Sequence, residues 1–95
     1  MRDYELMTIH RPDLAEDDIA AKVVELESYL SEHGASVKSK DLWGKRRFAY
    51  EIEHLSEGYY SVVNFQAEAA AIDSLDRMLS LADEVVRHKI VRLGG

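Results

Sequence analysis

The 95-residue sequence predicts an α+β domain in which six elements follow one another in the order βαββαβ. Over residues 4 to 9, an extended chain would place Tyr4, Leu6 and Thr8 on one face and Glu5, Met7 and Ile9 on the other, a pattern that favours a strand. Two later segments, near residues 14 to 33 and 67 to 82, place their apolar residues at helical spacing. Stretches rich in aromatic and β-branched residues follow both segments, and such residues favour strands.

Length and composition indicate one domain that spans residues 1–95. The formal net charge is −6, and 46% of the residues are hydrophobic, as in an ordinary globular protein. The absence of cysteine excludes disulfides and thiolate metal sites. No apolar run approaches the roughly 20 residues of a membrane-spanning helix, and Asp3 and Glu5 stand where a signal peptide would be apolar. We therefore expect a cytoplasmic protein without a membrane partner.

The first strand is expected from Tyr4 to Ile9, and Pro12 follows it. Asp13 is the expected N-cap of the first helix, with Glu16 as its partner in a capping box. The helix should cover residues 14 to 33, because Ile19, Val23, Leu26 and Leu30 fall on one stripe and Gly34 is a natural C-terminal stop.

A long β segment is expected from Ala35 to Ile52, with Gly44 as a bulge or kink. A turn over residues 53 to 58 then leads into a strand from Tyr59 to Phe65, so these two strands should form a hairpin.

The second helix is expected from Ala67 to Ala82, and the last strand from Val85 to Leu93. Two right-handed β-α-β crossovers would place both helices on one face of a four-stranded antiparallel sheet. This is the ferredoxin-like plan, and the first and last strands are expected to be its inner strands.

Catalysis is disfavoured by the residues available. No serine has a histidine and an acid nearby in a recognisable motif, and cysteine is absent. The loop after the first strand contains Arg11, but Pro12 lacks an amide hydrogen and Asp13 adds negative charge where a phosphate would lie. The four histidines are scattered without metal-ligand spacing. We expect no catalytic residue, cofactor, metal or small-molecule substrate.

Nucleic-acid binding has more support, from three consecutive cations in an acidic chain. Lys45, Arg46 and Arg47 follow Trp43 and Gly44, and such a cluster suits phosphate, although a solvated basic turn is the simpler interpretation of a lone triplet. A second basic group lies in the last strand, where Arg87 and Lys89 should share one face.

The block from Trp43 to Ile52 reads Trp-Gly-Lys-Arg-Arg-Phe-Ala-Tyr-Glu-Ile. Further characteristic positions are Tyr4-Glu5, Gly34 before a valine strand, Gly58-Tyr59, Leu75-Asp76-Arg77, Asp83 and Val86-Arg87-His88-Lys89. Together they resemble the bacterial small-subunit ribosomal protein S6 family, over residues 1 to about 93. The resemblance implies a ferredoxin-like structural protein of the 30S subunit. It also implies binding to the central domain of 16S ribosomal RNA together with ribosomal protein S18.

On this resemblance we expect phosphate contacts that position the RNA without reading its sequence. The candidates are Lys45, Arg46 and Arg47, followed by Arg2, Arg87, Lys89 and Arg92. The candidate partner surface is apolar and consists of Met7, Ile9, Tyr60 and Val62, with Trp43 either packed under the basic segment or in contact with the partner or RNA. A strand register shifted by one residue would instead place the first four in the core.

Two alternatives from other classes stay open at this point. A ligand-sensing regulatory domain of the same architecture would bind a small molecule and pair with itself through sheet edges. An enzyme would depend on His10 or Arg11. Thermal shifts with metabolites would favour the first, and an activity lost on replacing these residues would favour the second.

Overall fold

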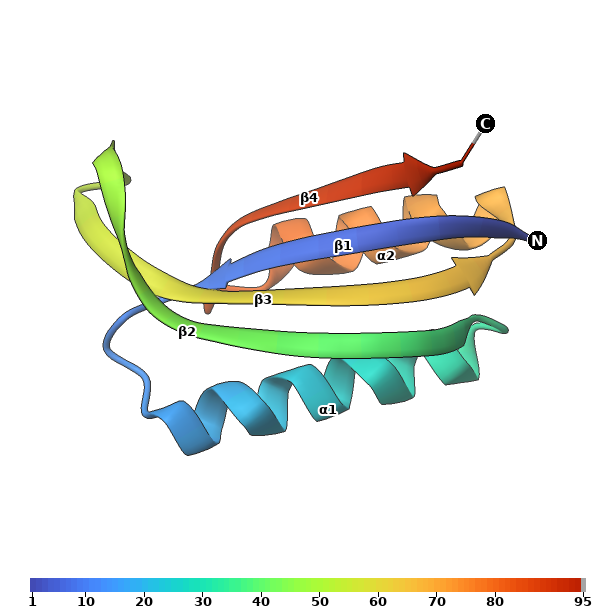
Figure 1. Ribbon diagram of the computed structural model, residues 1–95, viewed down its shortest axis with the longest axis horizontal. Coiled ribbons are helices and arrows are strands. Elements are labelled where there is room, and N and C mark those ends of the chain that lie inside the picture. The colour runs from blue at the N-terminus through green and yellow to red at the C-terminus, as the bar shows by residue number, and fades with distance from the viewer. Residues whose placement is uncertain (95) are drawn as a thin grey trace.

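The computed structural model describes residues 1–94 and has the predicted element order (Figure 1). The elements are β1 (Arg2–His10), α1 (Glu16–Glu32), β2 (Ser36–Ile52), β3 (Leu55–Ala67), α2 (Ala69–Leu81) and β4 (Val85–Leu93). Both helices cover one face of the antiparallel sheet, so the ferredoxin-like prediction is confirmed.

The strand order is β2-β3-β1-β4, so the central strands are β3 and β1. The prediction that β1 and β4 are the inner strands is correct for β1 and wrong for β4. The hairpin return brings β3 beside β1, and the crossover through α2 then carries the chain past β1, which leaves β4 at the edge. The aromatic-rich strand β3 therefore runs through the middle of the sheet.

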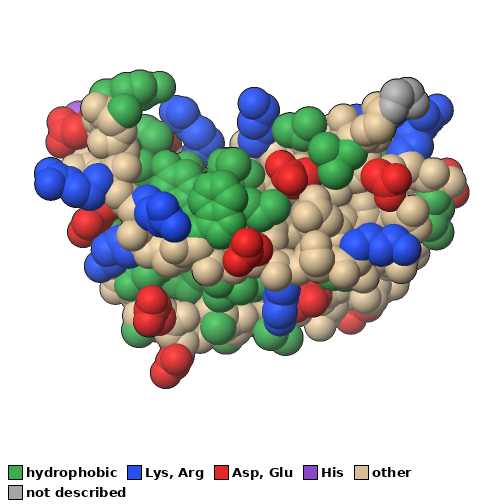
Figure 2. Space-filling model, in the orientation of Figure 1, with side chains coloured by type: hydrophobic (Ala, Val, Ile, Leu, Met, Phe, Trp, Pro, Cys, Tyr) green, Lys and Arg blue, Asp and Glu red, His purple; other side chains and the backbone are tan. Residues whose placement is uncertain are grey.

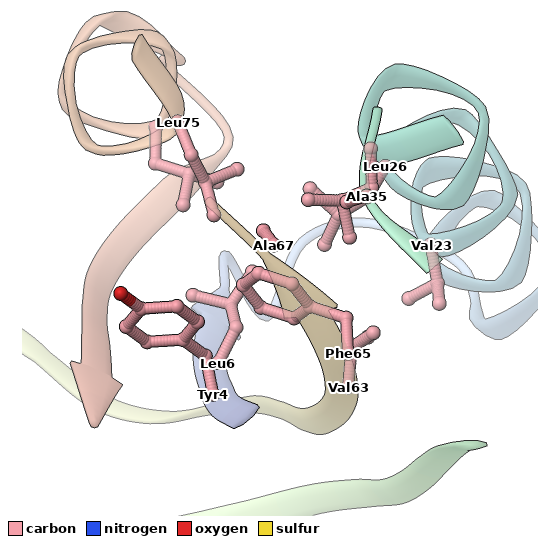
Figure 3. Close-up of a cluster of buried hydrophobic side chains, with 11 residues drawn as sticks. Tyr4, Leu6, Val23, Leu26, Ala35, Val63, Phe65, Ala67 and Leu75 are labelled. Atoms are coloured by element: carbon pink, nitrogen blue, oxygen red, sulfur yellow. The ribbon is translucent and has the colours of Figure 1, made fainter. Parts of the chain in front are cut away.

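The core lies between the sheet and the two helices. Tyr4 and Leu6 of β1 pair with Phe65 and Val63 of β3, and all four side chains point toward the helices (Figure 3). The rings of Tyr4 and Phe65 stack with centroids 5.7 Å apart. The helices contribute the apolar stripes expected from the sequence, namely Val23, Leu26 and Leu30 from α1 and Leu75 and Leu79 from α2.

The start of α1 differs from the prediction. Its N-cap is Ala15, whose backbone N–H donates to the carboxylate of Asp18 over 3.3 Å, while Asp13 pairs with Arg11 at 3.4 Å. The predicted Asp13 cap is therefore wrong, because the helix begins two residues too late for that carboxylate to serve its first amides. The predicted stop at Gly34 is confirmed, since this residue has a φ of +81°.

The β2–β3 turn is tighter than predicted. Only Glu53 and His54 form it, with φ values of 50° and 66°, and positive φ at both central residues is the signature of a type I′ hairpin. Neither residue is the glycine or asparagine that usually marks this turn, so its signal in the sequence was weak. Residues 55 to 58, expected in the turn, belong to β3. Gly44 has a φ of +85° beside a register shift, which confirms the bulge.

His10 ends β1 on the helix side and is only 4% exposed. Burial lowers its pKa from the ordinary 6.5, with Glu84 opposing that change and Lys22 adding to it. Below pH 6.5 the unfolded chain protonates this histidine while the folded chain resists protonation. We expect the free energy of unfolding to fall as the pH drops below 6.5, and His10→Gln to weaken that dependence in urea titrations. Equal pH profiles for both proteins would contradict this explanation.

Candidate nucleic-acid and protein interface

The β2–β3 hairpin extends beyond the end of β1 and curls over the face of the sheet that has no helices (Figure 1). Pairing of β1 with β3 ends at His10 and Tyr59, so earlier residues of β3 pair with β2 alone. We call residues 43–58 the arm. The bulge at Gly44 falls at its base, and bulges increase the local twist and bend of a strand.

Aromatic rings fill the concave side of the arm. Trp43 stacks on Tyr60 with centroids 6.3 Å apart, and Phe48 meets the same Tyr60 ring edge-on at 6.1 Å. Ile9 and Val62 of the central strands share this face and are buried, although no helix covers it. Their burial indicates a second, smaller apolar cluster, which we call the arm cluster and which comprises Met7, Ile9, Trp43, Phe48, Tyr60 and Val62.

The position of Gly58 shows how closely the arm approaches the sheet. A Cβ atom at this position would lie 2.7 Å from Cγ2 of Ile9, 2.9 Å from the carbonyl oxygen of His10 and 3.0 Å from Cζ of Phe48. A backbone atom cannot move aside as a flexible side chain can. Only glycine therefore fits here without displacing the arm.

Replacing Gly58 with alanine should lower the free energy of unfolding by about 1 to 3 kcal/mol, because the added methyl group overpacks this contact. Chemical denaturation of the variant would measure the loss. Ser56→Ala is the matched control on the same strand, because the exposed Ser56 should tolerate the change within about 0.5 kcal/mol. A neutral Gly58→Ala variant would show that the arm does not rest on the sheet in solution.

Three of the predicted cations border the arm cluster. Arg46 lies over the Trp43 ring with its guanidinium carbon 5.9 Å from the centroid, and its Nε–H donates to the Trp43 carbonyl over 3.3 Å. Arg87 and Lys89 pair with Ile9 and Met7 across β4 and β1, which places them on the helix-free face as alternation predicts. All three are exposed, and within residues 1–94 no acidic group lies within salt-bridge distance of them.

The other two residues of the basic triplet lie on the opposite, convex side of the arm. Lys45 pairs with Tyr59, whose side chain faces the helices, and its Nζ lies 5.2 Å from that ring centroid. Arg47 alternates with Arg46 and so shares the side of Lys45. Consecutive cations in an extended strand therefore face two different surroundings.

Arg2 and Arg92 do not join either group. They pair with Ala67 and Tyr4, which face the helices, at the end of the sheet far from the arm. Both are exposed. The seven predicted RNA-binding residues are thus distributed over three surfaces.

The helix-free face is divided by charge. Its end nearest the arm carries the arm cluster and the cations Arg46, Arg87 and Lys89. Asp3 and Glu5 lie on the same face farther along, and Asp41 borders the arm cluster, where it pairs with Val62. Figure 2 shows hydrophobic side chains gathered in the hollow beside the arm, with Lys and Arg side chains around them and Asp and Glu side chains next to the patch. An anionic ligand on this face would be drawn to the arm end and repelled from the other.

The loop after β1 does not form a phosphate cradle, since Arg11 is engaged with Asp13. Within residues 1–94 no three histidine or acidic residues are grouped closely enough to hold a metal ion. No helix in the same range is long and apolar enough to cross a membrane.

Comparison with known proteins decides the family. The model of the family described as "Ribosomal protein S6" matches residues 3–92 of the chain. The chain belongs to the ribosomal protein S6 family. Small ribosomal subunit protein bS6 of Desulforamulus reducens is 45% identical over 99% of this chain and 99% of its own length. The bS6 protein of Symbiobacterium thermophilum is 48% identical over 97% of both.

A solved structure supports the same assignment. The crystal structure of 30S ribosomal protein S6 from Thermotoga maritima superposes with a TM-score of 0.92 at 27% identity, covering 97% of this chain and 87% of that one. Members of the S6 family are structural, non-enzymatic components of the small ribosomal subunit and are cytoplasmic in bacteria. The comparisons therefore confirm the predicted family, and membership in that family confirms the predicted non-enzymatic character and cytoplasmic location.

Sequence reasoning did not include Phe48 and Gly58 among the residues of the candidate interface. Phe48 packs on Tyr60 from the arm, and Gly58 provides the space for that contact. The spacing of Trp43, Phe48 and Tyr60 has no single period, because the bulge at Gly44 interrupts β2 and the turn at residues 53–54 reverses the chain. Only the curl of the arm brings these rings together.

Proposed function

We propose that this chain binds the central domain of 16S ribosomal RNA cooperatively with ribosomal protein S18, and that it acts as an assembly component of the small subunit. The observation that carries the proposal is the arm itself. In a chain of net charge −6, it joins cations that have no acidic partner within residues 1–94 to a half-exposed aromatic cluster. Cations of this kind suit phosphates, and an apolar patch beside them suits a protein partner.

RNA contacts are assigned first to the arm. Lys45 and Arg47 on its convex side are free to reach a phosphate backbone, and Arg46 lies on the concave side beside Trp43. Arg87 and Lys89 extend the basic border across the helix-free face. Arg2 and Arg92 lie farther away and would have to meet a different stretch of RNA. These contacts hold the backbone in place, so specificity comes from the shape of the RNA and from the joint surface with the partner.

The arm cluster is assigned to the protein partner. Met7 and Tyr60 are half-buried, and Trp43 remains 43% exposed although it packs on Tyr60 and under Arg46. Because its ring is already engaged in this way, Trp43 is better suited to an edge contact with a protein than to stacking on a base. Ile9 and Val62 are buried and support this surface from below.

Binding of the chain to a central-domain 16S RNA fragment, with and without S18, across a salt series tests the proposal. We expect tight, salt-sensitive binding only when both proteins are present, because a net charge of −6 opposes binding to RNA by this chain alone. Failure to bind in either condition, with circular dichroism showing a folded protein, would overturn it. Equally tight binding without S18 would support the RNA contact but refute the cooperative partnership.

A further inference from the structure

A pocket of about 220 Å³ lies on the helix side of the sheet, away from the arm cluster. It opens between the two helices, where β1 ends and β4 begins. Its walls are apolar and come from three elements, namely Leu26 and Tyr29 of α1, Met78 and Leu79 of α2, and Val85 of β4.

The imidazole of His10 is one of the polar side chains that line the pocket, together with Thr8 and the charged residues Lys22, Glu25 and Glu84. The side chain is 4% exposed, and its Nδ1 has no hydrogen-bond partner within residues 1–94. The neighbouring Thr8 hydroxyl is already satisfied by Ser61, at 2.5 Å between the two oxygens. An unpaired buried polar atom is costly, and so it marks a place where a ligand group would be stabilised. A flip of the imidazole about its Cβ–Cγ bond exchanges the positions of nitrogen and carbon, so the ring can direct a nitrogen into the pocket.

Charges at the rim restrict the ligand class. Lys22 lies 3.6 Å from the Glu25 carboxylate and 3.8 Å from that of Glu84, so its charge is shared between two acids. The three groups carry one positive and two negative charges, and this surplus disfavours an anion. A neutral molecule with an apolar body avoids that repulsion.

The size of the pocket restricts the ligand further. An apolar cavity of about 150 Å³ accommodates benzene, so a pocket of this volume has room for one substituted ring or two small fused rings. Most of its lining is hydrocarbon, which favours binding of a flat apolar ring. The imidazole of His10 can form a hydrogen bond with one polar group of that ligand.

We propose that this pocket binds a small neutral aromatic molecule with one hydrogen-bonding group, of the size of phenol or indole, which pairs with the imidazole of His10. The apolar ring lies between Leu26 and Met78, and the hydroxyl or N–H group donates to an unprotonated ring nitrogen. The site is on the side of the sheet opposite the arm cluster, so its occupancy does not compete with the contacts assigned to RNA and S18.

Titration of the full 95-residue chain with phenol, indole and toluene, followed by NMR of labelled methyl groups, tests the proposal. We expect ring-current shifts confined to Leu26, Met78, Leu79 and Val85, with a Kd on the order of 1 mM or below for indole. Phenol and toluene have nearly the same shape, and phenol should bind about 2- to 10-fold more tightly because of one hydrogen bond. His10→Leu should abolish this preference while retaining the toluene shifts.

A second pair of variants keeps the test decisive if His10→Leu does not fold. Ala82→Phe fills the pocket and should abolish binding of all three probes. Leu81→Phe is its matched control, because Leu81 is 76% exposed and outside the pocket lining, and this variant should bind as the parent does. Absence of localised shifts in the parent at 5 mM probe, or shifts that persist in Ala82→Phe, would overturn the proposal. Equal affinity for phenol and toluene would overturn the role of His10.

Discussion

Replacing Phe65 with alanine should lower the free energy of unfolding by about 3 to 5 kcal/mol, the largest loss expected from a single change in this chain. Phe65 is 1% exposed on a central strand and stacks on Tyr4 with the ring centroids 5.7 Å apart. Its removal leaves a cavity between the sheet and both helices, which the fixed strands on either side cannot close. Urea or thermal denaturation would measure the loss, and the variant is expected to be partly unfolded at 37 °C.

Tyr50→Ala is the matched control for the aromatic truncation. Tyr50 lies in the arm and is 71% exposed, so its loss should change stability by no more than about 0.5 kcal/mol. A similar loss in both variants would contradict the assignment of the core to the helix side of the sheet. The comparison separates burial from the general loss of an aromatic ring.

Replacing Lys45 and Arg47 together with alanine should weaken assembly with RNA and S18 by roughly 25- to 60-fold at 0.1 M salt, as the loss of two phosphate contacts predicts. The plot of log K against log salt concentration has a negative slope, and the removal of two phosphate contacts should make it less steep by about 1.4 to 1.8 units. Arg46→Ala should make this slope less steep by about one unit or less. It should also disturb the Trp43 ring on which Arg46 lies. Folding should be nearly unchanged by either variant, since exposed charges contribute little to stability.

The control for this experiment changes the net charge equally at other places. Arg11 and Arg77 are exposed and lie outside the arm, and Arg11→Ala/Arg77→Ala removes the same two positive charges. If the control reduced the salt dependence of binding as much as Lys45→Ala/Arg47→Ala, the effect would come from the overall charge of the protein and not from contacts made by the arm. A slope unchanged in every variant would refute the basic triplet as a phosphate site.

Much of the fold was predictable because local patterns agree with the tertiary structure. The stripe of Val23, Leu26 and Leu30 is buried as helical spacing predicts, and Gly34 ends α1 with the positive φ that its position requires. The errors arose where the local signal was weak or misleading. Asp13 looked like a cap but is paired with Arg11, and the turn at Glu53 and His54 lacks the usual turn residues.

The candidate interface was predictable in composition and only partly in geometry. Alternation correctly placed Arg87 and Lys89 on the helix-free face, and the register of β1 with β3 places Met7, Ile9, Tyr60 and Val62 there as well. Alternation alone divides the consecutive cations of the basic triplet between two sides of a strand, but the sequence could not show which of them faces the arm cluster. That assignment depends on the bulge at Gly44, which shifts the register of β2.

The sequence by itself determined the family, the order of the elements and the apolar stripes of both helices, because each depends on residues close together in the chain. The tertiary structure alone decided the inner position of β3, the packing of Phe48 and Trp43 on Tyr60, and the pocket over His10. These features join residues from different elements, and their geometry follows from strand order, bulge and curl. Periodicity within a segment carries no information about which distant segment it will meet.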